Sequence, residues 1–148
     1  MPARLVPELY VSNLTVSLAF YTRFGFIVRY GRPAEAFAYI ERDGAELMLE
    51  EPRGRVWLVA PLERPLGRGI NLQVTVSDVD TLHDRALSTG LVPLSPLERR
   101  TYRRATDILT VRQFVIADPD GYLIRFSQMI GTTPLPAEEG QAAAGSAR

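Results

Sequence analysis

The chain has 148 residues, 46% of them hydrophobic, and its 17 basic and 17 acidic side chains give a formal net charge of zero. A neutral chain of this length can bury one core, but it lacks the basic footprint of a dedicated nucleic-acid or membrane-surface protein. The absence of cysteine excludes a disulfide framework, a thiolate zinc site and a cysteine nucleophile.

No stretch approaches the roughly 18 consecutive apolar residues of a membrane-spanning helix, and residues 1–13 lack the pattern of a signal peptide. We therefore expect a cytoplasmic protein. Every basic residue is arginine, which we interpret as codon bias in a GC-rich genome rather than as a recognition feature.

The first part of the chain predicts a β-α-β-β-β unit. Asn13 is typical of a helix N-cap, for a helix over about 14–24 that Gly25 ends. The dipeptide Asp43-Gly44 favours a hairpin turn between two alternating segments. The strands of this unit are expected near residues 5–11, 26–30, 37–42 and 45–50.

The same pattern returns further along the chain. V-S-D-V from Val76 matches V-S-N-L from Val11, and P-D-G-Y-L-I-R-F from Pro119 matches R-D-G-A-E-L-M-L from Arg42. Such self-similarity indicates two copies of one supersecondary module. The second copy is expected to have a helix capped by Asp78, which ends at Gly90, and strands near residues 70–76, 112–117 and 122–128.

These elements predict a division of the chain into two modules, a linker and a tail. The linker is rich in Pro, Gly and Arg and carries the only tryptophan, Trp57. The tail has too few apolar side chains to offset the entropy of ordering, so we expect it to be disordered. The predicted bounds are 1–51 for the first module, 52–69 for the linker, 70–130 for the second module and 131–148 for the tail.

One face of the predicted strands is unusually polar. Alternation places Asn71 and Gln73 opposite the apolar set of their strand, which must face the module's own helix. The polar set then faces water or a ligand: one interpretation is a solvated sheet, and the other is a concave, partly aromatic cup. We assign to this face Glu8, Tyr10, Phe37, Glu46, Met48, Glu50, Asn71, Gln73, Phe114 and Arg125.

Two segments carry a family resemblance: V-S-N-L-T-V-S-L-A-F-Y-T-R-F-G-F (Val11–Phe26) and D-P-D-G-Y-L-I (Asp118–Ile124). They resemble the vicinal oxygen chelate superfamily, which holds glyoxalase I, extradiol dioxygenases, fosfomycin-modifying enzymes and bleomycin resistance proteins. The resemblance covers about residues 4–128. It implies the α+β glyoxalase/bleomycin resistance fold, in which two tandem βαβββ modules form a curved mixed sheet with a concave cup. Because this fold hosts several chemistries, the resemblance does not select one.

Enzymes of this family hold a divalent metal in the cup through His, Gln or Glu. The resemblance places the ligands seven residues before each polar helix start and five residues after each hairpin Asp, which here gives Val6, Met48, Asn71 and Arg125. Only Asn71 is even a weak ligand, and the Arg125 cation opposes metal binding. We therefore expect neither a metal nor a cofactor. The only histidine, His83, lies mid-helix, where we expect a surface or boundary role.

An enzyme remains the leading alternative. Glu8, Glu50 and Gln73 keep the parity of the polar face, so they would suit a metal site shifted by two residues. Glu8 or Glu50 would otherwise serve metal-free acid–base chemistry. A third possibility is a dimeric scaffold that binds no ligand.

A chain that keeps this fold without the metal ligands resembles the bleomycin resistance branch. The homodimers of that branch sequester the drug in an aromatic, acidic groove. Pro7 and Phe37 stand where that branch has a strand Pro and a groove Phe, and V-R-Q-F (Val111–Phe114) resembles its G-x-R-E-F segment. The chain departs from the branch where Thr110 replaces the groove Trp and Gln113 replaces the Glu. The chain as a whole is also not acidic.

We therefore predict a homodimeric, metal-free protein that sequesters a planar, amphipathic ligand such as a bleomycin-type antibiotic, with no nucleic-acid or membrane partner. We expect the ligand to stack on Phe37, with Trp57 or Tyr102 as a second platform, although a linker Trp also commonly caps a core edge. We interpret Glu98–Arg104 as a solvated loop or, alternatively, as an anion-recruiting rim. We assign no catalytic residue. The candidate ligand-binding residues are Phe37, Tyr39, Glu46, Met48, Glu50, Trp57, Asn71, Gln73, Tyr102, Arg112, Phe114 and Arg125.

Overall fold

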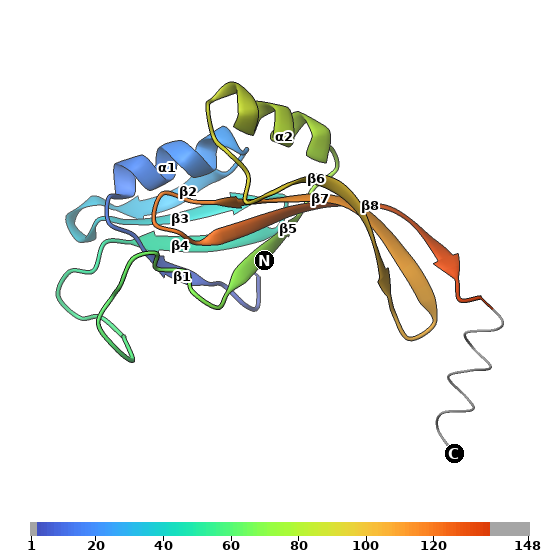
Figure 1. Cartoon of the computed structure of the whole chain (residues 1–148). Coiled ribbons are helices and arrows are strands. Elements are labelled where there is room, and N and C mark those ends of the chain that lie inside the picture. Colours follow the sequence, from blue (N-terminus) through green and yellow to red (C-terminus); the bar gives the residue numbers. More distant parts are fainter. Residues whose placement is uncertain (1–2, 137–148) are drawn as a thin grey trace, which may run out of the picture.

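The computed structural model describes residues 3–136, which form two four-stranded sheets with one α-helix each (Figure 1). The first module contains β1 (Glu8–Tyr10), α1 (Leu14–Arg23), β2 (Ile27–Arg32), a 3-10 turn (Pro33–Glu35), β3 (Phe37–Arg42) and β4 (Ala45–Glu50). The second contains β5 (Asn71–Thr75), α2 (Val79–Ser88), β6 (Ser95–Arg103), β7 (Asp107–Ala117) and β8 (Leu123–Pro134). The predicted duplication of a βαβββ module is confirmed.

Both sheets have the same topology. The strand orders are β1-β4-β3-β2 and β5-β8-β7-β6. The first strand of each module pairs in parallel with the last, and the remaining pairs are antiparallel. This shared order follows from the repeat, because equivalent segments of the two modules meet equivalent partners.

The local signals in the sequence act as predicted. The side chains of Asn13 and Asp78 accept hydrogen bonds from backbone N–H groups in the first turns of α1 and α2, which satisfies donors that a helix leaves unpaired. Gly25 and Gly90, which follow the two helices, have φ values of +90° and +79°, a conformation that favours glycine. No helix within residues 3–136 is long and apolar enough to cross a membrane.

The arm formed by β6, β7 and β8 differs from the sequence-based expectation. Most of the predicted loop Glu98–Arg104 belongs to β6, which pairs with β7 from Ser95↔Val115 to Arg103↔Ile108. The strand β8 reaches Pro134, so the first residues of the predicted tail belong to the sheet. In Figure 1 this arm extends to the right, beyond the body of the molecule. Residues 137–148 of the predicted tail lie outside the described residues.

The two helices lie on the same side of the molecule (Figure 1), and Arg85 Nη1 donates a hydrogen bond to the carbonyl of Arg23. One hydrophobic core runs through both modules. Within it, the Phe24 ring lies 5.2 Å from that of Phe126. The modules therefore share a core, which fixes their sheets relative to each other.

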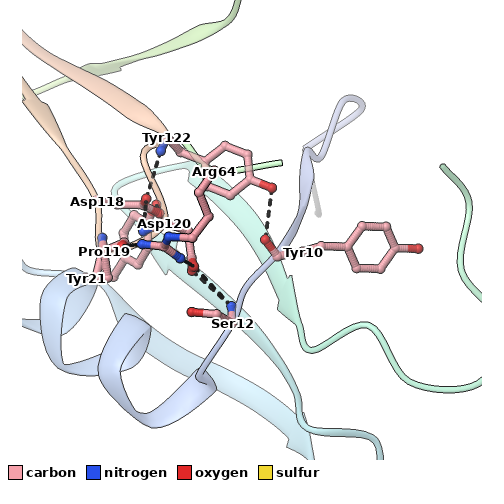
Figure 2. Close-up of polar contacts among 8 residues, drawn as sticks. All are labelled: Tyr10, Ser12, Tyr21, Arg64, Asp118, Pro119, Asp120 and Tyr122. Atoms are coloured by element: carbon pink, nitrogen blue, oxygen red, sulfur yellow. Dashed lines mark hydrogen bonds and ion pairs between the residues drawn. The ribbon is translucent and has the colours of Figure 1, made fainter. Parts of the chain in front are cut away.

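A polar junction also joins the modules. Figure 2 shows the turn that carries Asp118 and Asp120 between the end of β1 and the linker. The Tyr21 hydroxyl donates to Asp118 over 2.7 Å, and the backbone N–H of Ser12 donates to Asp120. From the linker, Arg64 pairs with Asp120 at 2.9 Å. The D-P-D-G segment thus holds both modules and the linker together.

Candidate functional site

The face of the first sheet turned away from α1, which we call the first open face, gathers five of the predicted site residues. Phe37 and Tyr39 of β3 lie opposite Glu50 and Met48 of β4. Glu46, two residues before Met48, points to the same face, because side chains alternate along a strand. Glu8 and Tyr10 of β1 complete the set, and they pair in register with Met48 and Glu50.

An aromatic group that the sequence did not reveal lies on this face. Tyr30 of β2 stacks on Tyr39 with ring centroids 5.1 Å apart and planes at 16°. Tyr30 is 51% exposed, whereas Phe37, the predicted platform, is only 3% exposed. The Arg32 guanidinium covers the Phe37 ring at 3.7 Å. Of these rings, it is therefore Tyr30 that offers an accessible surface for stacking.

The carboxylates of the first open face are engaged with their neighbours. Burial, followed by a hydrogen bond with Glu50 and the charge of Glu50, raises the pKa of Glu8, while Arg32 opposes the rise. Glu46 is buried and accepts hydrogen bonds from the Tyr39 hydroxyl at 3.1 Å and from the backbone N–H of Ala3. A raised carboxyl pKa, as at Glu8, is a property that acid–base chemistry can use.

The linker reaches the first open face at Tyr10. The backbone N–H of Trp57 donates a hydrogen bond to the Tyr10 hydroxyl over 2.9 Å. The Trp57 side chain is 68% exposed, and the Arg55 guanidinium lies 4.9 Å from its ring. It therefore does not cap a core edge. A polar cavity of about 380 Å³ opens beside this part of the linker, between Glu50, Arg53 and Glu35.

A second cavity, of about 280 Å³, brings residues of both modules together, and we call it the seam pocket. It is lined by Leu5 and Pro7, the start of β4, and residues 71–74 of β5. The lining is mostly apolar. Here the structure unites three of the predicted site residues, Glu46 from the first module and Asn71 and Gln73 from the second.

Gln73 belongs to the second open face, the side of the second sheet turned away from α2. Arg125 of β8 lies opposite Gln73 on β5 and Val115 on β7. Farther along this face, Gln113 Nε2 donates a hydrogen bond to the Tyr102 hydroxyl over 2.6 Å. Tyr102 thus belongs to the second sheet, whereas the aromatic group of Tyr30 and Tyr39 belongs to the first.

Two predicted site residues lie on the wrong side of the second sheet for this face. Phe114 is fully buried, 5.3 Å from the His83 ring of α2, and Arg112 pairs with Asp80 of α2 at 2.6 Å. The expectation that Phe114 lines the cup is wrong, because the β7–β8 register sets Phe114 opposite Phe126 on the helix side. Arg112, a candidate ligand-binding residue, lies on that same side. His83 occupies the predicted boundary position.

The residues present do not fit a metal ion. At the positions that the resemblance assigned to ligands, Met48 lies opposite Glu8, and Arg125 brings a cation opposite Gln73. Glu8 and Glu50 are hydrogen-bonded to each other, while Gln73 belongs to the other sheet. Within residues 3–136, no group of three or more His, Asp or Glu side chains could hold a metal ion.

Comparison with known proteins identifies the sequence family. The profile described as Glyoxalase/Bleomycin resistance protein/Dioxygenase superfamily matches residues 4–126. A superfamily member from Vibrio splendidus 12B01 is 38% identical, with 83% of this chain and 95% of that chain covered and a TM-score of 0.40. Functionally curated proteins give no match.

Two more distant structures share the fold. TioX from Micromonospora sp. ML1 is 22% identical, with coverage of 86% and 99% and a TM-score of 0.63. An integron cassette protein from the mobile metagenome of V. Cholerae is 18% identical, with coverage of 86% and 95% and a TM-score of 0.64.

Proposed function

Because the chain belongs to the glyoxalase/bleomycin resistance protein/dioxygenase superfamily, we propose that it binds a planar, amphipathic small molecule without a metal. The ligand lies against the first open face and reaches into the seam pocket. The protein sequesters this molecule and does not transform it, in the manner of a bleomycin resistance protein.

The observation that carries the proposal is the Tyr30–Tyr39 stack on the first open face. An exposed ring supported from below by a second ring adds a stacking surface without losing its own packing. Met48 lies on the same face, opposite Tyr39, and its flexible thioether adapts to flat apolar groups. Glu8 and Glu50 beside it supply the polar groups that would orient an amphipathic ligand.

The chemistry of the four ligand positions supports a site that works without metal. A guanidinium at position 125 repels a divalent cation, and neither the Val6 nor the Met48 side chain is a ligand for the hard or borderline metals of this family. Binding by stacking and burial needs no ion.

We extend the proposal to a homodimer. The outer edges of both sheets have no partner strand within residues 3–136, and unpaired edges are commonly covered by another chain. An antibiotic-type ligand and a cytoplasmic location belong to the same proposal, because a sequestering protein must meet the drug before its target does.

A second candidate function rests on the Glu8–Glu50 pair. The raised pKa of Glu8 would allow this carboxyl to give or take a proton at a bound ligand. Turnover of a bound ligand that is lost in Glu8→Gln, with binding retained, would favour this acid–base enzyme over the sequestering protein.

A thermal-shift screen tests the proposal. Bleomycin-type drugs, aromatic metabolites and divalent metals would be added separately to protein treated with EDTA. A ligand at 100 times its dissociation constant stabilises the fold by roughly 2.7 kcal/mol. We expect a planar organic compound to raise the melting temperature and the metals to have no effect. A shift produced only by metals would reject the proposal.

A further inference from the structure

Arg125 is a cation without an ion-pair partner in the part of the chain that the structure describes. Its side chain is partly buried, and its Nε atom is shielded from solvent and has no hydrogen-bond acceptor within residues 3–136. It forms no ion pair with the acidic residues between positions 3 and 136. Most of the other arginines whose contacts are described pair with a carboxylate, as Arg64 does with Asp120.

The surroundings of Arg125 are polar but carry little negative charge. Its neighbours across the strands are Gln73 and Val115. Ser127 lies two residues along β8 and faces Gln113. Two acidic residues share the parity of this face: Glu98, beyond Gln113 on β6, and Asp107, which pairs with Arg104. Glu46 in the seam pocket already accepts hydrogen bonds from Tyr39 and Ala3. None of these carboxylates neutralises Arg125.

A second orphaned atom lies on the same face. Gln113 is 5% exposed, and its Oε1 has no donor among the described residues, although its Nε2 donates a hydrogen bond to Tyr102. Because Gln113 and Arg125 are diagonal neighbours on β7 and β8, an unpaired acceptor and an unpaired donor flank one patch of the second open face. Leaving the Arg125 donor unpaired away from water is unfavourable, and an acceptor on a bound molecule would remove that cost. The Gln113 Oε1 acceptor would need a separate donor on the same molecule.

We infer that Arg125 binds an anionic group of the ligand, a carboxylate or a phosphate, so that the molecule bound here is a planar organic anion. The planar fork of a guanidinium matches both anions with two parallel hydrogen bonds. Gln73, which lines the seam pocket and lies opposite Arg125, connects this patch to that pocket. The inference rests on the proposed small-molecule site and names the charge of its ligand.

The test compares three probes that share one ring system: 2-naphthoate, 2-naphthyl phosphate and the uncharged 2-naphthamide. Calorimetry would measure their binding to the wild type, Arg125→Met and Arg125→Lys. Arg100→Met is the matched control, because Arg100 lies on the same face, opposite Val111, but is exposed. Urea unfolding of each free protein shows whether the variants fold and whether Arg125 has a structural partner.

We expect at least one anion to bind the wild type about tenfold more tightly than 2-naphthamide, since a bidentate charge-assisted contact is lost with the amide. The anion that benefits distinguishes a carboxylate from a phosphate ligand. Arg125→Met should abolish the preference without weakening the amide, Arg125→Lys should restore part of it, and Arg100→Met should leave it unchanged. The free Arg125→Met protein should be at least as stable as the wild type, because a partly buried cation whose Nε has no described partner is removed.

Equal binding of all three probes, unaffected by Arg125→Met, would overturn the anion assignment and leave the aromatic site standing. If neither anion binds at millimolar concentration, the assignment is also overturned, and binding of the amide alone shows that the proposed function survives. Destabilisation of the free protein by Arg125→Met would overturn it independently, because the guanidinium would then have a partner in the fold.

Discussion

Asp118 and Asp120 carry the polar contacts between the modules at the scale of single residues. Asp118 accepts hydrogen bonds from the Tyr21 hydroxyl and from backbone N–H groups of its own turn. Asp120 is 1% exposed and accepts from Ser12 and Arg64. Gly67 of the linker packs so closely that a Cβ atom there would lie 2.6 Å from the Tyr122 Cα. The D-P-D-G segment, which is part of the family resemblance, therefore connects the two modules and the linker in this chain.

Asp120→Ala should destabilise the protein by about 1.5–3 kcal/mol, since a buried charged acceptor is removed and the Ser12 N–H loses its partner. The midpoint of urea unfolding measures the effect. Glu63→Ala is the matched control, because Glu63 also lies in the linker and pairs with an arginine, but its side chain is 80% exposed. Equal midpoints for the two variants would contradict a role for Asp120 in the junction.

Tyr30→Leu should weaken binding of a planar ligand by about two- to tenfold, the loss expected when a stacked ring is replaced by an aliphatic side chain. Calorimetry with the compound selected by the thermal-shift screen measures it. Val28→Leu is the control, because Val28 lies on the same strand but pairs with Ile40 on the helix side. If both variants bind like the wild type, the ligand does not use the aromatic group.

The sequence predicted the two faces of β4 because the apolar side chains of Ala45, Leu47 and Leu49 alternate with Glu46, Met48 and Glu50. Alternation alone could not choose the face of Phe37, because residues 37–40 of β3 are apolar and buried on both sides.

Sequence reasoning failed for Phe114, where β7 carries apolar side chains on both faces, and period alone cannot choose between them. It also missed Tyr30, because a register shift between Val28 and Tyr30 breaks the alternation of β2. The faces on which Phe114 and Tyr30 lie are set by pairing with β8 and β3. Local sequence does not specify that pairing.

Helix α1 shows how separate elements support each other. Asn13 caps the helix from its own segment, and Glu51, just beyond β4, accepts a hydrogen bond from the Leu14 N–H over 3.0 Å. That backbone hydrogen bond, followed by the side chain of Arg53, lowers the pKa of Glu51 against the effect of desolvation. The carboxylate also complements the positive end of the helix dipole.

Because the pKa of Glu51 is lower in the folded state, the native protein binds fewer protons there than the unfolded chain does. The stability from Glu51 is therefore present above its unfolded pKa of 4.5 and is lost as the pH falls through the folded value. The difference in unfolding midpoint between the wild type and Glu51→Gln should shrink between about pH 7 and pH 3. A difference that stays constant over this range would contradict the cap.

Glu8 should behave with the opposite sign. Its pKa is raised in the folded state, so its stabilising contribution is present below its unfolded pKa of 4.5 and is lost as the pH rises through the folded value. The stability contributions of Glu51 and Glu8 therefore change in opposite directions with pH, and unfolding measured across the same pH range distinguishes them.

The strand β6 was not predicted from the sequence, which was interpreted as a loop over most of its length. Its run of charged residues has no apolar alternation, and a charged run is ordinarily solvated. The structure forms a strand there because the neighbouring strand β7 supplies a continuous row of backbone partners. Backbone pairing holds this strand, whereas its side chains mostly remain exposed.

At the scale of the whole molecule, the outer edges of the two sheets have no partner strand among residues 3–136, and several apolar side chains of β2 and β8 are exposed, among them Ile27, Met129 and Ile130. We expect these surfaces to be covered in a homodimer. Light scattering at micromolar concentration should give twice the chain mass of 16.5 kDa. A mass equal to that of one chain would count against the dimer.

The central claim, that the protein binds a planar ligand without a metal, is tested most directly by calorimetry on protein stripped with EDTA. The ligand is the compound that gives the largest thermal shift. We predict a saturable heat of binding in EDTA that does not change when zinc, nickel or manganese replaces the chelator. No heat at millimolar ligand, or heat that appears only after a divalent metal is added, would contradict the claim.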